Sequence, residues 1–92
     1  MKNYTFYSDA GHGWLEVDLQ ELVALGVAHA ISRYSYIKRT DEGTKVYLEE
    51  DCDATLFSET MTSRGIEFAV THFDHGIDSP IRNLLRFHEG RV

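Results

Sequence analysis

The stretch that most constrains the fold of this chain is residues 4–17, YTFYSDAGHGWLEV, which has the pattern of a β-hairpin. Side chains in its first half alternate between two faces, as they do in a half-buried strand. A turn is predicted at Asp-Ala-Gly-His-Gly, because glycine reaches positive φ freely and aspartate hydrogen-bonds the backbone ahead of it. Trp14 opens the second strand, where we expect it to be a largely buried anchor.

Two helices are predicted from apolar spacing and from the residues at their ends. The segment 18–25 begins with Asp18 and Glu21, which have the spacing of a capping box, and Gly26 is a suitable stop. Its leucines lie mainly on one helical face. The segment 53–64 carries a second apolar stripe and is also followed by glycine.

Three further strands and a last helix complete the prediction. Segments 34–39 and 45–50 flank a polar loop with a glycine, which is typical of a hairpin. Segment 66–73 alternates apolar and polar residues, so we expect a half-buried strand. Ser79 and Pro80 then resemble the start of a helix. A short C-terminal helix is expected there, from the helical spacing of Ile81, Leu84, Leu85 and His88.

These elements predict one α+β domain that covers residues 1–92. The expected order is ββαββαβ, followed by the short C-terminal helix. We expect a mostly antiparallel sheet of about five strands, with two main helices packed on one face. The last strand follows a helix and can lie parallel to a neighbour, which would make the sheet mixed.

The charge balance constrains the partners. The chain has a formal net charge of −6, which repels nucleic-acid phosphate and favours basic partners. The alternative is that the charge serves solubility alone. The N-terminus shows no signal-peptide pattern, and no apolar run is long enough for a membrane helix, so the expected location is the cytoplasm.

Cys52 is the only cysteine, so no intrachain disulfide can form, which fits a reducing compartment. Neighbouring carboxylates should raise the pKa of its thiol and make it a poor nucleophile. We therefore expect Cys52 to be a small core residue.

A histidine and aspartate group is the main candidate for catalysis or metal binding. His72 and His75 form an H-x-x-H pair, and Asp9 and His12 lie in the predicted hairpin turn. If both histidines of the pair lie on one strand, their side chains point to opposite faces of the sheet. In addition, only two candidate metal ligands are close together in the sequence. Ordinary surface or loop histidines are the alternative, and we predict no metal and no cofactor.

The chain also has a dense acidic run, formed by Glu49, Glu50, Asp51 and Asp53. Paired carboxylates can act as a general acid and base, whereas carboxylates ahead of a helix commonly stabilise its N-terminus. A third interpretation is a protein-binding face, on which these acids would meet a basic partner. The acids at 41 and 42 could join the cluster, with Tyr34, Tyr36 and Tyr47 as aromatic anchors.

A basic and aromatic run is compatible with nucleic-acid binding. Its interleaving resembles a surface on which bases stack. The acidic residues that follow it and the net charge argue against this role, and a mixed solvent face is the alternative. The run consists of Arg33, Tyr34, Tyr36, Lys38 and Arg39.

Two strings resemble small uncharacterised proteins found in phages, prophages and plasmids: FYSD at 6–9 with GHGWLEV at 11–17, and VYLEEDCD at 46–53. The resemblance does not extend to the stretch from His72 onward. It implies a mobile-element origin and brings no assigned catalytic residues. Small acidic proteins from such elements are often inhibitors of host defence, including anti-CRISPR proteins, so the resemblance implies that class by analogy.

The resulting hypothesis is a non-catalytic protein-binding module in a bacterial cytoplasm. It would bind a basic surface of a host protein or ribonucleoprotein complex. The contacts would come from Glu49, Glu50, Asp51, Asp53, Tyr34 and Tyr36. An alternative is a small metal-dependent or hydrolytic enzyme centred on Asp9, His12, Trp14 and His72. A third hypothesis is a homodimer formed through an exposed sheet edge.

Overall fold

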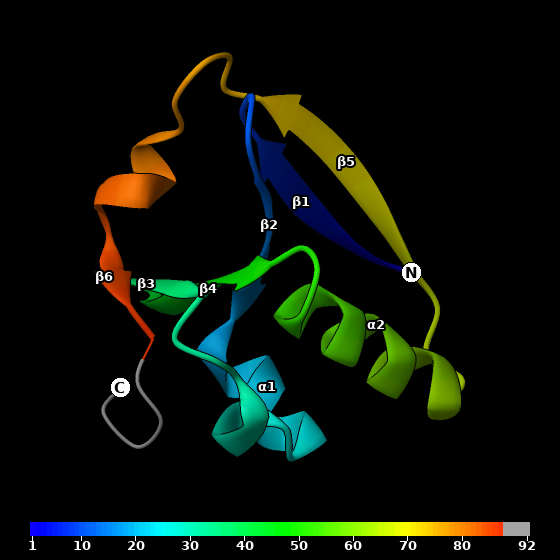
Figure 1. Ribbon diagram of the computed structural model, residues 1–92. Helices are drawn as coiled ribbons and strands as arrows, with labels where there is room; N and C mark the ends of the chain where they lie inside the picture. Colours follow the sequence, from blue (N-terminus) through cyan, green and yellow to red (C-terminus); the bar gives the residue numbers. More distant parts are fainter. Residues whose placement is uncertain (88–92) are drawn as a thin grey trace.

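A six-stranded mixed sheet organises the chain in the computed structural model, which describes residues 1–87 (Figure 1). The strand order is β5-β1-β2-β4-β3-β6. β5 runs parallel to β1, and every other neighbouring pair is antiparallel. The strands are β1 Lys2–Ser8, β2 Gly13–Asp18, β3 Tyr36–Thr40, β4 Gly43–Glu49, β5 Phe68–Asp74 and β6 Leu85–Arg86.

Two α-helices and two 3₁₀ turns connect the strands. The helices are α1 Leu19–Leu25 and α2 Asp53–Ser63, and the turns are η1 Ala28–Ala30 and η2 Pro80–Asn83. The Glu21 carboxylate accepts a 3.4 Å hydrogen bond from the Asp18 N–H at the start of α1, which is one half of the predicted capping box. Gly26 ends the helix with φ at 76°, a conformation that glycine adopts without strain. None of the described helices is long and apolar enough to cross a bilayer.

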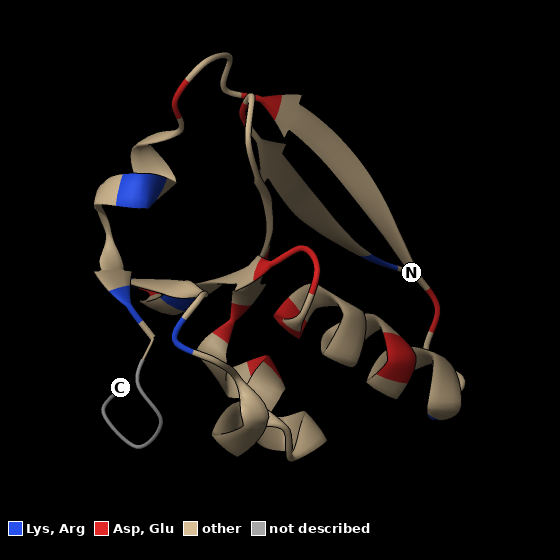
Figure 2. Cartoon of the chain, viewed as in Figure 1, with Lys and Arg blue, Asp and Glu red and all other residues tan. Residues whose placement is uncertain are grey.

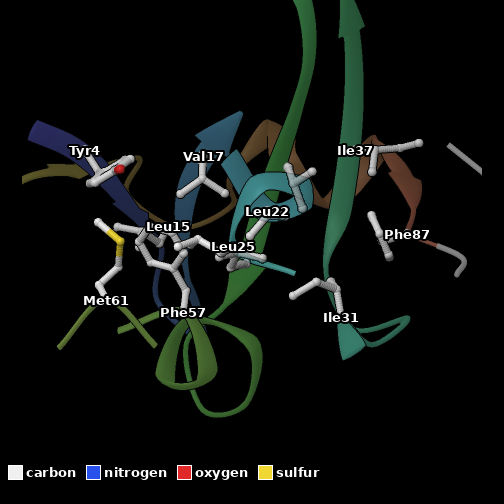
Figure 3. Packing of buried hydrophobic residues seen from close by; sticks show 12 residues of the cluster. Tyr4, Leu15, Val17, Leu22, Leu25, Ile31, Ile37, Phe57, Met61 and Phe87 are labelled. Atoms are coloured by element: carbon white, nitrogen blue, oxygen red, sulfur yellow. The ribbon is translucent and has the colours of Figure 1, made fainter. Parts of the chain in front are cut away.

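The main core lies between one face of the sheet and the two α-helices (Figure 3). Leu22 on α1 and Phe57 on α2 are fully buried against the sheet. The Tyr4 ring meets Phe57 edge-on, with centroids 5.3 Å apart, which links β1 to α2. The strands supply alternate residues to this face, among them Leu15, Val17, Ile37, Val46 and Leu48.

A smaller aromatic cluster occupies the opposite face of the sheet. Trp14, Tyr36 and Tyr47 are buried there under Ile81. The cover is the segment 75–84, which crosses this face from β5, at one edge of the sheet, to β6, at the other. Trp14 is therefore the buried anchor that the sequence predicts, with 2% of its surface exposed.

The α+β class and the helices on one face were predicted correctly, but the strand count and the end of the chain were not. The sheet has six strands and is mixed. The predicted C-terminal helix is replaced by η2 and β6, and His88 lies outside the described residues. Ile81 packs on the aromatic face of the sheet, whereas Phe87 belongs to the main core on the opposite face. The chain between them therefore crosses from one face to the other, and it does so as the edge strand β6 beside β3.

Candidate functional site

A cleft of about 470 Å³ gathers residues from four separate segments of the chain. Tyr34 and Tyr36 come from the approach to β3 and its first residue, and Glu49 ends β4. Asp51 and Cys52 precede α2, Arg82 and Arg86 come from the last segment, and His12 and Trp14 come from the first hairpin. Four of the six proposed contact residues thus line one cleft or its rim: Tyr34, Tyr36, Glu49 and Asp51.

Aromatic rings stacked beneath arginines form one side of the cleft. The Arg82 guanidinium lies 5.4 Å from the centroid of the Trp14 ring, and that of Arg86 lies 4.8 Å from the Tyr36 centroid. Both rings are almost fully buried, so the arginines cover them. Such stacking favours a guanidinium over an ammonium group. Tyr34 differs from both buried rings, because 62% of its surface is exposed.

Asp9 fixes this arginine side by joining the first hairpin turn to the crossing segment. Its carboxylate accepts hydrogen bonds from the Gly11 and His12 N–H groups, both at 3.0 Å, and from the Ser79 N–H at 2.9 Å. Arg82 donates to it from Nε at 2.6 Å and from Nη2 at 2.8 Å. The hydrogen bonds from Arg82 hold the pKa of Asp9 well below its usual range. Asp9 therefore holds the first hairpin turn, the Ser79 backbone and the Arg82 guanidinium together.

A buried polar network supports the opposite side of the cleft. The Asp53 carboxylate accepts hydrogen bonds from the N–H and Oγ of Ser32, at 3.1 and 2.7 Å, and from the Ser35 hydroxyl. The hydroxyl oxygen of Ser35 in turn accepts a hydrogen bond from the Glu49 N–H at 3.0 Å, and the backbone carbonyl of Ser35 accepts one from the Phe87 N–H at 2.8 Å. Ser35 and Asp53 are both fully buried. The network therefore ties the end of β4, the start of α2 and β6 to the loop that carries Tyr34.

The acidic turn between β4 and α2 forms the other rim of the cleft. This turn is red in Figure 2, whereas η2 and β6 carry blue segments. Asp51 is exposed and Glu49 is half-buried. No ion pair joins Glu49, Glu50 or Asp51 to another residue within 1–87. The carboxylates of this turn are therefore available to a partner, opposite a rim that carries arginines.

Two of the proposed contact residues lie elsewhere. Asp53 is 1% exposed, so its carboxylate supports the cleft from inside and does not reach a partner. Glu50 is half-buried and lines a neighbouring groove between α2 and β5.

The wider acidic cluster is divided by the length of a strand. The acids at 41 and 42 lie at the β3–β4 turn, and β4 separates them from Glu49 by about 20 Å, at the usual rise of a strand. Tyr47, the third possible anchor, is 6% exposed and donates its hydroxyl to Glu16 at 2.9 Å. Only Tyr34 among the three tyrosines projects into solvent.

The prediction that Cys52 is a core residue is wrong, because its side chain is exposed at the N-terminus of α2. A nearby Asp53, together with Glu49, raises the pKa of the thiol, as the sequence predicts. The Asp53 side chain points inward and accepts hydrogen bonds from Ser32 and Ser35. Cys52, the residue before it, therefore lies at the surface.

The two histidines of the H-x-x-H pair lie on opposite sides of the sheet. The His72 ring contacts Phe6 on the helix side, with centroids 5.3 Å apart. His75 stacks on Tyr7 on the other side, at 5.0 Å, and its Nδ1 is 2.8 Å from the Ser79 hydroxyl. Among residues 1–87, no group of three or more histidine, cysteine or carboxylate side chains is arranged to hold a metal ion.

The basic and aromatic run is divided between environments. Arg33 and Tyr34 are exposed in the loop before β3, while Tyr36 is buried. Lys38 and Arg39 follow each other on β3, so their side chains point to opposite faces. The run therefore does not make one stacking surface.

Arg82 and Arg86 are residues of the cleft that sequence reasoning missed. Their signal was two arginines four apart in an acidic chain, within a segment for which a helix was predicted. As a helix, the segment would place both arginines on one outer face, whereas η2 and β6 place them over Trp14 and Tyr36.

In comparisons with known proteins, the chain matches no family model, no curated protein and no solved structure.

Proposed function

We propose that this protein is a non-catalytic protein-binding module and that its contact surface is the acidic rim of the cleft. This acidic rim consists of Glu49 and Asp51, with Tyr34 beside it, while Glu50 between them faces the neighbouring groove. The observation that carries the proposal is the meeting of an exposed tyrosine with carboxylates that have no ion-pair partner among residues 1–87. A tyrosine ring next to such carboxylates suits a basic side chain, which can pair with an acid and lie along the ring.

The support beneath the acidic rim also favours binding. The Ser35–Asp53 network holds the backbone of Glu49 and the loop of Tyr34 in fixed positions before any partner arrives. A preformed surface loses less conformational entropy on association than a mobile one. The arginines opposite the rim would reject a uniformly basic surface over the whole cleft, so the partner should present a basic group beside a neutral or acidic one.

A more specific form of the proposal names the partner class. The net charge of −6 and the resemblance to phage and plasmid proteins favour a host complex that handles nucleic acid, with inhibition of a defence system as the outcome. Such a complex presents a basic groove, which the acidic rim would occupy in place of nucleic acid.

The test is recovery of a partner from lysate of a bacterial host with tagged protein at low and high salt. We expect one basic protein or complex to be recovered, with less of it as salt rises. The triple variant Glu49→Gln, Glu50→Gln and Asp51→Asn should lower the affinity for this partner by about tenfold or more. Binding to the purified partner is then measured by calorimetry.

A matched control neutralises three exposed carboxylates away from the acidic rim: Asp41→Asn, Glu42→Gln and Glu67→Gln. The control changes the net charge by the same amount, so it separates a local contact from the overall charge. Equal losses in both triple variants would replace the proposed surface with a general electrostatic effect, and no loss in the rim variant would refute it.

A further inference from the structure

Within residues 1–87, β5 forms one edge of the sheet, and no described strand pairs with its outer side. It pairs with β1 on one side only. Six of its seven residues are exposed and the other is half-buried. The strand carries no proline, lysine or arginine, and its only charged residue is Asp74 at its end. It therefore lacks the features by which sheet edges usually avoid pairing with another strand.

The hydrogen bond that follows β5 shows which of its backbone groups are free. The His75 N–H donates to the Ser8 carbonyl at 2.7 Å. Backbone groups of successive strand residues point to opposite sides, so Ala69, Thr71 and Phe73 also direct their N–H and C=O groups toward β1. The groups that face outward, away from β1, belong to Phe68, Val70, His72 and Asp74.

This outward edge is complementary to itself. An antiparallel copy placed about a two-fold axis through Thr71 would oppose Val70 to His72 of the second copy, and Phe68 to its Asp74. All of these residues have outward backbone groups, so each such pair can exchange two hydrogen bonds. A shift by one residue would oppose outward groups to inward ones, which excludes that register.

The side chains also suit this pairing. Phe73, 53% exposed, would lie opposite Ala69 of the second copy, where a small residue leaves room for its ring. Val70, 38% exposed, would be covered on the helix side by His72 of the second copy. No like charges oppose each other along the seam, because residues 68–73 are uncharged.

We propose that the chain forms a two-fold symmetric homodimer through antiparallel pairing of β5 with β5 of a second copy. The two six-stranded sheets then continue into one. The acidic rim of the cleft lies outside this seam, so the proposal is independent of the binding function above. Each copy carries a net charge of −6, so self-association strengthens as salt rises, opposite to the expected behaviour of partner binding.

The first test is sedimentation equilibrium of the full chain over concentrations up to about 1 mM, the range in which weak association becomes measurable. We expect a monomer–dimer equilibrium. Thr71→Lys places like charges opposite each other at the axis and should raise the dimer dissociation constant about tenfold or more. Gln20→Lys, at an exposed position of α1, adds the same charge away from the seam and is the matched control.

Mixing two variants makes the test specific. Thr71→Lys and Thr71→Glu should each be mainly monomeric, and an equimolar mixture should recover dimer, because opposite charges then meet at the axis. Circular dichroism of each variant confirms that the fold is retained. A dimer that survives in both single variants, or a wild-type chain that stays monomeric throughout, would overturn the proposal.

Hydrogen exchange measured by NMR supplies a second readout that needs no substitution. The amides of Val70 and His72 should exchange more slowly as protein concentration rises. Those of Ala69 and Thr71, already bonded to β1, should not change. Equal behaviour of the two sets would contradict the proposed seam.

Discussion

Two buried or shielded aspartates determine how the loops of this protein meet. Asp9 accepts hydrogen bonds from the first hairpin turn and from the crossing segment, so two parts of the chain seventy residues apart share one carboxylate. Asp53 does the same for the start of α2 and the loop before β3. In the sequence both look like ordinary turn or capping acids. Their roles depend on donors that only the folded chain brings to them.

Replacing Asp53 by alanine should destabilise the protein by about 3 kcal/mol, because the half-buried donors of Ser32 and the buried hydroxyl of Ser35 would lose their acceptor. Chemical denaturation monitored by Trp14 fluorescence measures this change. Asp51→Ala, two residues earlier and exposed, is the control and should stay within about 0.5 kcal/mol of wild type. Equal effects of the two substitutions would mean that the network contributes little.

Gly13 is constrained by a close approach. A side chain on this residue would overlap the ring of Phe6 on the neighbouring strand. Gly13→Ala should therefore cost about 1–3 kcal/mol of stability in thermal or chemical unfolding. Combining it with Phe6→Leu should recover part of that loss, because the smaller side chain frees the space, so additive costs in the double variant would contradict this explanation.

Two tyrosines predict a loss of stability at alkaline pH. Burial and a hydrogen bond to a carboxylate, Glu21 for Tyr4 and Glu16 for Tyr47, raise the pKa of both phenols well above their usual value. The folded state therefore prefers the neutral phenols. Their contribution to stability is complete below the unfolded-state pKa of about 10 and falls as pH rises above it.

The measurement is thermal unfolding across this pH range, together with phenolate absorbance. The absorbance difference between wild type and the Tyr4→Phe, Tyr47→Phe double variant isolates these two groups. We expect it to appear together with the loss of circular dichroism. A phenolate signal that appears while the fold is intact would show that the two phenols are accessible.

At the scale of elements, local pattern predicted the first five strands and both α-helices but failed after residue 75. The first hairpin and α1 carry their own signals in alternation, a turn and an end glycine. The segment 75–84 has apolar residues at helical spacing, yet it crosses the aromatic face. Its Ile81 contacts Trp14 and Tyr47, which lie more than thirty residues away in sequence, so tertiary contacts override its local preference.

The sequence also does not determine which strands form the edges of the sheet. Segment 66–73 alternates as a half-buried strand, and the sequence allows it to lie parallel to a neighbour. The structure places it beside β1 at the outer edge, where it remains exposed on both faces. Alternation predicts a strand, but it does not state which strands pair, because pairing depends on loop paths across the whole molecule.

At the scale of the whole molecule, charge and sheet edge define two independent surfaces. The acidic rim of the cleft joins the end of β4 to α2, whereas the β5 edge is separated from β4 by β1 and β2. Salt should weaken binding at the first surface and strengthen self-association at the second. A salt series on wild type therefore separates the two proposals in one experiment.

The sequence by itself determined the α+β class, both α-helices, the first hairpin and the burial of Trp14, because these follow from local periodicity and turn chemistry. It also placed Tyr34, Tyr36, Glu49 and Asp51 in one candidate set. Only the tertiary structure decided that Asp53 is buried, that Cys52 is exposed and that Arg82 and Arg86 complete the cleft. The physical reason is that hydrogen-bond partners and stacked rings come from segments distant in sequence, and a local pattern holds no information about which distant group arrives.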